Sequence, residues 1–367
     1  MMQFIRKITQ QSQFRPAIIV PTAIALIFSV FTLTAPMDQG RIASAISLGV
    51  VNLDTGLKFP PLKVSTKVME GMAENLPFTV VNFTSEDEAR EALDRGDVAV
   101  ALVFPADFSK RVASSDPIEM QLINTNHLTV LETQLGAQMP MLLQSAFSAG
   151  VLMLRQSLAA GKLPDGTFPV TVEVETLHPA TNPASLMAPF AMMYTTWLGA
   201  FVGSMMLFMA SRRSGSGAAA GVVRTIVPIV VTGLAATTIA TVVSWTTGSW
   251  GNFLCLMGTY WAVQLTLSWL IGGVFAVFGL ASVLVVLPVV FYQTTLGGAQ
   301  APAAAAPEWL LNIFGSVPFD SVGAVYRGVV LGGGTGFPTT LSLSAGAIGI
   351  ALIWGGSMYI GYRNPEA

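Results

Sequence analysis

The sequence predicts a polytopic α-helical membrane protein with six transmembrane helices and an α/β extracytoplasmic domain inserted between helices 1 and 2. Only 10% of the 367 residues are charged and 52% are hydrophobic, whereas soluble domains carry about 25% charged residues. The mean hydropathy is +0.63. Long charge-free stretches lie near both ends of the chain, and the polar stretch between them holds most of the charge.

Composition also limits the chemistry that the chain can perform. Its net charge of −2 excludes a basic nucleic-acid binder. A single cysteine, Cys255, forms neither an internal disulfide nor a thiolate zinc cluster, and His127 and His178 lack the spacing of a metal-ligand pair. The sequence contains no GxxxxGK(S/T) phosphate loop. We therefore expect no enzyme activity, metal or cofactor, and we expect any ATP to be handled by a partner.

The N-terminal region begins with a basic segment that precedes an apolar run. Residues 1–15 place apolar side chains at near-helical spacing beside Arg6 and Lys7, which predicts a short helix at the cytoplasmic interface; disorder is the alternative. Residues 16–36 are long enough for a first span, because a bilayer core of about 30 Å needs about 20 apolar residues. A cleaved signal peptide is the other interpretation, but the run is longer than a usual signal core and Pro36 follows the only plausible cleavage point.

A polar segment at 37–185 separates this span from five more. Residues 251–296 contain no charge over 46 positions, which is too long for one helix and suits two helices joined by a turn near 270–273. The predicted segments are spans at 186–210, 222–245, 251–270, 272–296 and 341–360, a cytoplasmic loop at 211–221, an extracytoplasmic loop with short helices at 297–340, and a cytoplasmic tail at 361–367.

The placement of charge predicts the orientation of the chain. With both termini in the cytoplasm, six spans put seven basic residues and one acidic residue inside, and they leave 11 of the 18 basic and 19 of the 20 acidic residues outside. Cytoplasmic loops of membrane proteins carry such an excess of Lys and Arg. If residues 251–296 were instead one span and a re-entrant segment, Arg363 would lie outside.

The polar segment reads as an alternation of strands and helices. Runs rich in β-branched residues predict strands at 46–52, 78–83, 98–104, 118–124 and 170–177. Ser85, Glu88 and Gly96 predict the start and end of a helix at 86–95. A longer amphipathic run at 128–160 contains Pro140 as a kink or break. This alternation predicts an α/β or α+β layered domain.

The predicted span interiors carry no Asp, Glu, Lys, Arg or His, which argues against a proton antiporter. Neutral polar and aromatic residues remain as candidates to line a path for an amphiphile. They are Tyr260, Trp261 and Gln264 in span four and Gln293 in span five. Interfacial anchoring and helix packing explain them equally well.

Small residues recur at the four-residue interval that lets helices approach closely, either within the chain or across a dimer. They are Gly199 and Gly203 in span two, and Ala347, Ala351 and Gly355 in span six. The glycine-rich segment 331–336 (LGGGTG) lacks the context of a phosphate loop, and we expect a flexible approach to span six.

Several motifs resemble one known family in their order and spacing. They are VVNLDTG at 50–56, AREALDRGDVAVALVFPADF at 89–108, IEMQLINTN at 118–126, HPATNPASLMAPF at 178–190, and APEWLLNIFGSVPFDSVGAVYRGVVLGGG at 306–334. Together they are similar to the type-2 ABC exporter permease family (ABC-2 type membrane domain). The closest branch is that of the phage-infection-protein (Pip-like) and nitrosoguanidine-resistance permeases. The family's outer-loop motif corresponds to Pro307, Trp309, Pro318 and Arg327.

The resemblance implies an exporter permease in the cell membrane that moves a hydrophobic or amphipathic molecule outward. It implies a homodimer or a pair with a related permease, and a cytoplasmic ABC ATPase that contacts Arg6, Lys7, Arg212 and Arg213. This chain departs from the large Pip-like proteins by a shorter ectodomain without their coiled-coil insertion. The alternative is a secretion-accessory or surface-receptor membrane protein whose ectodomain binds a partner without transport.

Overall fold

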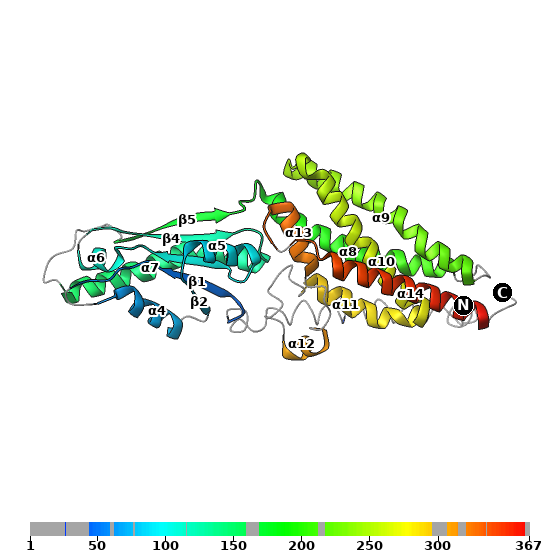
Figure 1. The fold of residues 1–367 in the computed structure, drawn as a ribbon, viewed down its shortest axis with the longest axis horizontal. Helices are drawn as coiled ribbons and strands as arrows, with labels where there is room; N and C mark the ends of the chain where they lie inside the picture. The colour runs from blue at the N-terminus through cyan, green and yellow to red at the C-terminus, as the bar shows by residue number, and fades with distance from the viewer. Residues whose placement is uncertain are drawn as a thin grey trace, which may run out of the picture.

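A computed structural model shows an α/β domain and a helical bundle placed end to end along the long axis (Figure 1). It describes residues 26, 44–58, 62–75, 78–114, 116–158, 169–211, 217–295, 307–314, 321–334 and 336–363. The predicted interface helix at 1–15 lies outside these residues, as do almost all of the first span and the residues Arg212, Arg213 and Pro318.

The α/β domain contains a five-stranded sheet with the strand order β2-β1-β3-β4-β5. β1 pairs in parallel with β2 and β3, β3 pairs antiparallel with β4, and β4 pairs in parallel with β5. The strands are β1 (Ser47–Asn52), β2 (Thr79–Phe83), β3 (Val100–Phe104), β4 (Ile118–Thr125) and β5 (Val170–Leu177). All five strands predicted from β-branched content are therefore confirmed, within two residues at each end.

Helices cover both faces of this sheet. Alternate residues of a strand point to opposite faces, and Val50 and Val51 of β1 accordingly belong to two different apolar clusters. Val50 packs in the cluster that includes residues of α4 (Val64–Asn75), α6 (Phe108–Ala113) and α7 (Val130–Leu158), whereas Val51 packs with α5 (Glu86–Arg95). The result is a three-layer domain with two cores.

Local capping explains where α5 begins and ends. Ser85 Oγ accepts a hydrogen bond from the Glu88 backbone N–H at 3.2 Å, and Gly96 ends the helix in the left-handed conformation with a φ of 82°. The Glu88 carboxylate accepts from the backbone N–H and the hydroxyl of Thr84, one residue before the expected partner. The predicted capping signals thus set both ends of the helix.

The bundle consists of long apolar helices. Its elements are α8 (Pro183–Ser211), α9 (Gly217–Thr247), η1 (Trp250–Asn252), α10 (Phe253–Phe278), η2 (Gly279–Ser282), α11 (Val283–Thr295), α12 (Glu308–Phe314), α13 (Ser321–Leu331) and α14 (Thr339–Arg363). In the described part of the chain, four stretches are long and apolar enough to cross a bilayer: 183–211, 217–247, 250–294 and 339–359. The third includes α10, η2 and α11.

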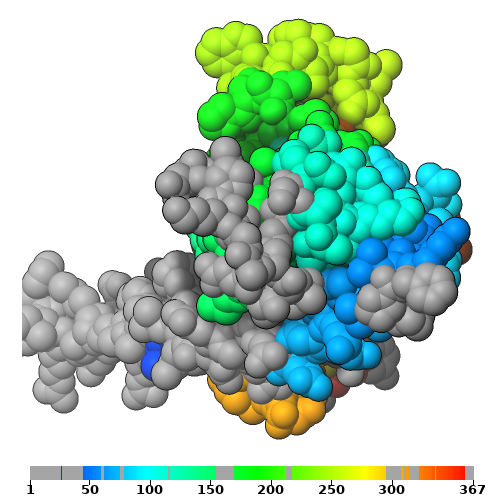
Figure 2. Space-filling model, turned by 90° about the vertical axis from the view of Figure 1, so that its left-hand side faces the viewer, coloured from blue at the N-terminus to red at the C-terminus, as the bar shows by residue number. Residues whose placement is uncertain are grey.

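The outer surface of the bundle is apolar. Leu234, Leu284 and Leu343 are each more than 60% exposed, which suits side chains that face lipid. Figure 2 views the molecule from the α/β end and shows the turn between α9 and α10 projecting beyond the domain. Trp245 and Trp250 lie exposed at this turn, and tryptophan is enriched where helices meet the membrane surface.

The break between α10 and α11 differs from its predicted position at 270–273. α10 continues to Phe278, and Gly279, with a φ of 65°, is the first residue of the turn η2. Gly273 has a different role, because a Cβ added to it would lie 2.7 Å from Leu352 Cβ of α14. The glycine that looked like a turn signal in the sequence permits close helix packing.

The start of α9 also differs from the prediction. α9 begins at Gly217, within the predicted loop 211–221, so that Arg224 lies inside the helix rather than near its entrance. A Cβ added to Gly217 would lie 2.5 Å from the Ser357 carbonyl oxygen of α14. Close packing against α14 therefore extends helical structure into a glycine-rich segment.

Glycines bring α10 and α14 into backbone contact. A Cβ added to Gly349 would lie 2.5 Å from the Trp269 carbonyl carbon, and one added to Gly356 would lie 2.5 Å from the Ala276 carbonyl group. Among the packing residues named from the sequence, Gly199 approaches Gln264 of α10, while Gly203 has open space around it. Ala347, Ala351 and Gly355 are exposed on α14.

We expect Gly349→Ala to lower the free energy of unfolding by about 1–3 kcal/mol, because the new methyl group must push α14 away from α10. Gly355→Ala is the matched control on the same helix, since a Cβ there meets nothing within 4 Å; it should leave stability unchanged or raise it by up to about 1 kcal/mol. Denaturant unfolding of the purified protein followed by circular dichroism measures both changes. Equal effects of the two substitutions would contradict the packing described here.

Candidate functional site

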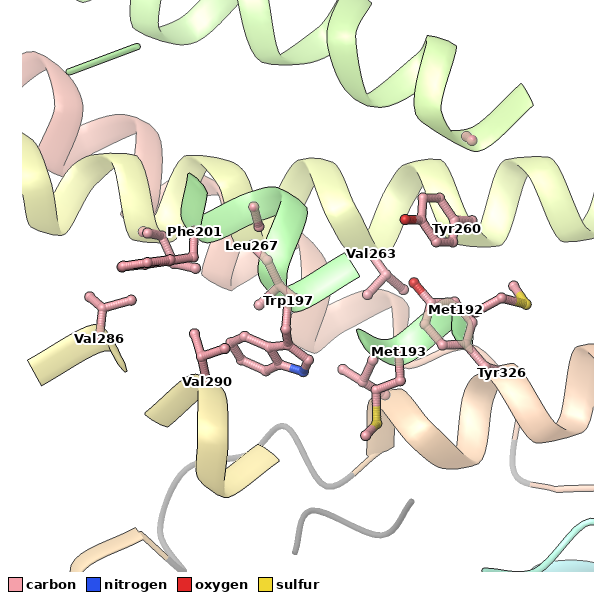
Figure 3. Close-up of a cluster of buried hydrophobic side chains, with 14 of the residues drawn as sticks. Met192, Met193, Trp197, Phe201, Tyr260, Val263, Leu267, Val286, Val290 and Tyr326 are labelled. Carbon is pink, nitrogen blue, oxygen red and sulfur yellow. The ribbon is translucent and has the colours of Figure 1, made fainter. Parts of the chain in front are cut away.

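A cluster of polar side chains lies buried where α8, α10 and α13 meet. Tyr260 and Tyr326 are 1% and 0% exposed, and their rings stack with centroids 5.8 Å apart. The Tyr260 hydroxyl donates to Thr195 Oγ1 at 3.0 Å, and the Thr196 hydroxyl lies 2.7 Å from the Tyr326 hydroxyl. Figure 3 shows the two tyrosine rings facing each other beside Met192.

Helix geometry explains how these residues meet. Thr195 and Thr196 follow Pro183, the first residue of α8, by 12 and 13 positions, and at 1.5 Å per residue they lie roughly 18 Å along that helix. Tyr260 and Gln264 are four residues apart on α10, so their side chains share one face of the helix. The low exposure of Tyr260, Tyr326 and Gln264 places the cluster inside the bundle rather than at its surface.

Three side-chain amide atoms of two glutamines in the bundle lack hydrogen-bond partners within the described chain. The side-chain oxygen of Gln264 has none, and neither side-chain polar atom of Gln293 has one. The two residues are 5% and 0% exposed. A buried polar group without a partner costs about 1–3 kcal/mol, so these amides are available to bind a polar group that enters the bundle.

Trp261, the fourth residue predicted to line a path, lies elsewhere. It is 37% exposed, and its indole Nε1 donates to the Ile229 carbonyl oxygen of α9 at 3.1 Å. The indole also lies against Gly233 of α9, where an added Cβ would be 3.5 Å from Trp261 Nε1. This contact joins α9 to α10 near the surface, which is the packing role that the sequence left open.

The rest of the core around these groups is apolar. Trp197 and Phe201 of α8 pack with Val286 and Val290 of α11 in the cluster drawn in Figure 3. The site thus combines a large apolar surface with a few neutral hydrogen-bonding groups. Among the described residues these groups are neutral, and their combination with apolar neighbours suits contact with an amphipathic molecule.

Sequence reasoning did not single out Thr195, Thr196 or Tyr326. The adjacent threonines in an apolar span were a usable signal, because such residues form hydrogen bonds between membrane helices. Tyr326 was hidden in a segment predicted as an outer loop with short helices. Its contact with Thr196 joins residues 130 positions apart, a pairing that no local pattern indicates.

A second polar region joins α13 to the α/β domain. The Arg327 Nε donates to the His127 carbonyl oxygen at 2.6 Å. His127 and His178, which the sequence placed apart, meet edge to face with ring centroids 5.6 Å apart. Burial lowers the pKa of His127 to about 4, and the neighbouring His178 and Arg327 act in the same direction, so this ring is neutral at pH 7.

The glycine-rich segment after α13 packs against the same histidine. His178 Nε2 lies 2.5 Å from Asp94 Oδ1, and the Gly334 N–H donates to the Asp94 carbonyl oxygen at 2.8 Å. A Cβ added to Gly332 would lie 2.8 Å from His178 Nδ1. The segment expected to be a flexible approach to span six is instead a tight contact between α13, α5 and the end of β5.

Arg224 is buried near the end of the bundle that lies away from the α/β domain. It is 4% exposed and donates to Ser211 Oγ at 2.8 Å and to Ser357 Oγ at 3.0 Å, with its guanidinium 4.8 Å from the centre of the Phe208 ring. These contacts join α8, α9 and α14. The sequence places Arg224 at the loop-side end of its span; α9 begins seven residues earlier, and hydroxyl groups and an aromatic face accommodate the buried charge.

The outer-loop motif predicted from the sequence is spread over several elements. Pro307 precedes α12, and Trp309 lies 48% exposed on α12. Arg327 lies on α13 and donates to the His127 carbonyl oxygen of the α/β domain. The described residues contain no group of three or more His, Cys, Asp or Glu arranged to hold a metal ion.

Comparison with known proteins gave one result. A family model described as "ABC-2 family transporter protein" matches residues 17–358, which is most of the chain. No curated protein and no solved structure matches the chain.

Replacing Gln264 and Thr196 by apolar residues of similar size should have opposite effects on stability. We expect Gln264→Leu to leave the free energy of unfolding unchanged or raise it by about 1 kcal/mol, because it removes an unpartnered oxygen. Thr196→Val should lower it by about 1–3 kcal/mol, because it takes the partner from the buried Tyr326 hydroxyl. Thermal unfolding in one detergent compares the two variants, and destabilisation by Gln264→Leu would show that its amide is already satisfied.

Proposed function

The chain belongs to the ABC-2 transporter family, and from this premise we propose that it is the permease subunit of an ABC exporter that moves a hydrophobic or amphipathic molecule outward. Membership and the apolar helices make it a multi-pass membrane protein. ABC-2 permeases generally work with a cytoplasmic ATPase. The substrate class, the outward direction and the Pip-like branch are parts of the proposal.

The observation that carries the substrate class is the pair of unpartnered amides in an apolar bundle. Gln264 and Gln293 offer unpartnered amide atoms inside the bundle. Tyr260, one turn of α10 from Gln264, stacks on Tyr326, and the two tyrosine hydroxyl groups are bonded to Thr195 and Thr196. A wholly apolar passenger would gain nothing from these groups, and a strongly charged one would lack a counter-charge there. An amphiphile with a neutral or weakly polar part matches both properties of the lining.

The energy source is proposed to be a separate ATPase. In the four candidate spans, Arg224 is the one residue among Asp, Glu, Lys, Arg and His, whereas proton-coupled carriers commonly use ionisable groups at membrane depth. Arg224 engages two serine hydroxyls. The proposed ATPase contacts remain Arg6, Lys7, Arg212 and Arg213, and the last two connect α8 to α9 directly after Ser211.

A paired arrangement of permeases completes the proposal. Ala347, Ala351 and Gly355 form an exposed small-residue stripe on α14, and such a stripe permits close approach of a helix from a second subunit. In the proposed orientation both termini are cytoplasmic and the α/β domain lies outside. The second candidate function, a surface receptor or secretion-accessory protein, would need the α/β domain but no ATPase.

Purification in mild detergent tests the proposal. We expect an ABC ATPase to copurify and its ATP hydrolysis to rise in the presence of the chain. The double substitution Arg212→Glu, Arg213→Glu should reduce copurification at least about fivefold, because an ATPase surface that attracts two arginines repels two glutamates.

Lys110→Glu is the matched control, because it reverses a charge on the exposed surface of α6 in the α/β domain; it should leave copurification unchanged. Two results would refute the proposed function: the absence of any ATPase from the purified complex, or export that stops when an uncoupler collapses the proton gradient while ATP is maintained.

A further inference from the structure

The α/β domain contains a cleft that the transport proposal does not use. It has a volume of about 460 Å³ and lies between α4, α6 and α7. These helices cover one face of the sheet, and α4 and α6 lie at the end of the domain away from the bundle (Figure 1). Small-molecule sites have volumes of about 300–1,000 Å³, so the cleft is large enough for a ligand.

The walls of the cleft are two apolar helix faces. Val64 and Val68 of α4 and Leu143 and Phe147 of α7 line it, and each pair is four residues apart, so that both members project from the same side of their helix. Phe108 of α6 closes one side. Among the described residues of the lining, Lys67 of α4 is the one charged side chain, and it is exposed.

Glycines keep the space open. Gly71 lies seven residues after Val64, and Gly150 lies seven residues after Leu143, so each continues the lining face of its helix. A Cβ added at either position would meet nothing within 4 Å. Protein interiors are packed so closely that few voids exceed the size of a water molecule. Larger side chains at Gly71 and Gly150 would reduce the volume of the cleft.

A buried carboxylate fixes two of the walls. Asp54 is 3% exposed and accepts hydrogen bonds from Ser65 Oγ of α4 at 2.8 Å and from the backbone N–H of Ser109 of α6 at 3.1 Å. The Ser109 hydroxyl also donates to Asp54 and accepts from the Val64 N–H at 2.8 Å. The positions of α4 and α6 are thus set without a ligand, and the cleft is preformed.

We propose that this cleft binds a free single-chain amphiphile with an anionic head group, of the fatty-acid type. The apolar walls take the chain, and Lys67 at the rim pairs with the head group. α4 and α6 lie at the end of the α/β domain away from the bundle, so we take the occupant to be a free molecule rather than a lipid of the bilayer around the bundle.

This binding does not depend on transport activity. If the proposed export function also holds, the cleft gives an outward-moving amphiphile a place to bind on the α/β domain.

The test uses the full chain in phosphatidylcholine nanodiscs with a palmitic acid that carries a photoactivatable diazirine. After irradiation and proteolysis, mass spectrometry should locate adducts on α4 and on residues 143–151 of α7. Gly71→Leu and Gly150→Leu should each reduce these adducts about fivefold or more, because a side chain then occupies the cleft. Ser145→Leu, at an exposed position on the opposite side of α7, should not reduce them.

The head group is tested separately. Lys67→Gln should reduce labelling by the fatty acid about two- to fivefold, as expected for an exposed ion pair. It should leave labelling by the uncharged monoacylglycerol with the same chain unchanged.

The proposal is overturned if adducts form on the bundle helices alone, or if both glycine variants keep their circular dichroism and label like the wild type. Labelling of the cleft by a photoactivatable diacyl lipid in the nanodisc would contradict a free single-chain occupant. If one glycine variant does not fold, the labelling of the other glycine variant and of Lys67→Gln tests whether the cleft binds the fatty acid. Because adducts are located directly, absence of an ATPase partner would refute the export function and leave this result intact.

Discussion

The structure depends on one constraint: helices inside a bilayer must pack so that their backbone groups and most of their polar side chains find partners within the protein, and Gln264 and Gln293 are among the exceptions. α10 meets this constraint through contacts with α8, α9 and α14. Gly349 and Gly356 let the α14 backbone touch that of α10, and Trp261 and Trp269 donate to carbonyl groups of α9. Once α10 is held in this way, Tyr260 and Gln264 are fixed at depth facing α8.

The same helices carry polar contacts at both ends of the bundle. At one end, Arg327 donates to the His127 carbonyl oxygen and the Gly334 N–H donates to the Asp94 carbonyl oxygen, so that α13 and the residues after it are joined to the α/β domain. At the other, Arg224 joins α8, α9 and α14. In the proposed function, an ATPase at the α8–α9 connection would contact a helix, α8, that also carries Thr195 and Thr196 of the buried cluster.

Much of the fold was predictable from the sequence because its signals are local. Alternating β-branched residues mark a strand wherever one face is buried, and Ser85 and Gly96 mark the ends of α5 because they satisfy or terminate its backbone. Charge-free runs of suitable length likewise mark apolar helices. These patterns need no knowledge of what lies across the fold.

Features that depend on distant partners were not predictable in this way. Gly273 has the sequence signature of a turn, yet it packs against α14. Tyr326 and Thr196, like His127 and His178, meet only after folding. Of the residues predicted to line a path, Gln264 and Gln293 are buried, as that role requires, whereas Trp261 faces the surface. The sequence of one span does not show which of its polar side chains faces the core, because that depends on where the neighbouring helices lie.

In the proposed orientation, the bundle crosses the bilayer with the α/β domain outside the cell and the α8–α9 connection inside. Single cysteines at Lys110 and Ser214 in a Cys255→Ala background test it in intact cells with a membrane-impermeant maleimide. We expect labelling of Lys110→Cys, and labelling of Ser214→Cys only after the membrane is made permeable. Labelling of Ser214→Cys in intact cells, with Lys110→Cys protected, would contradict it.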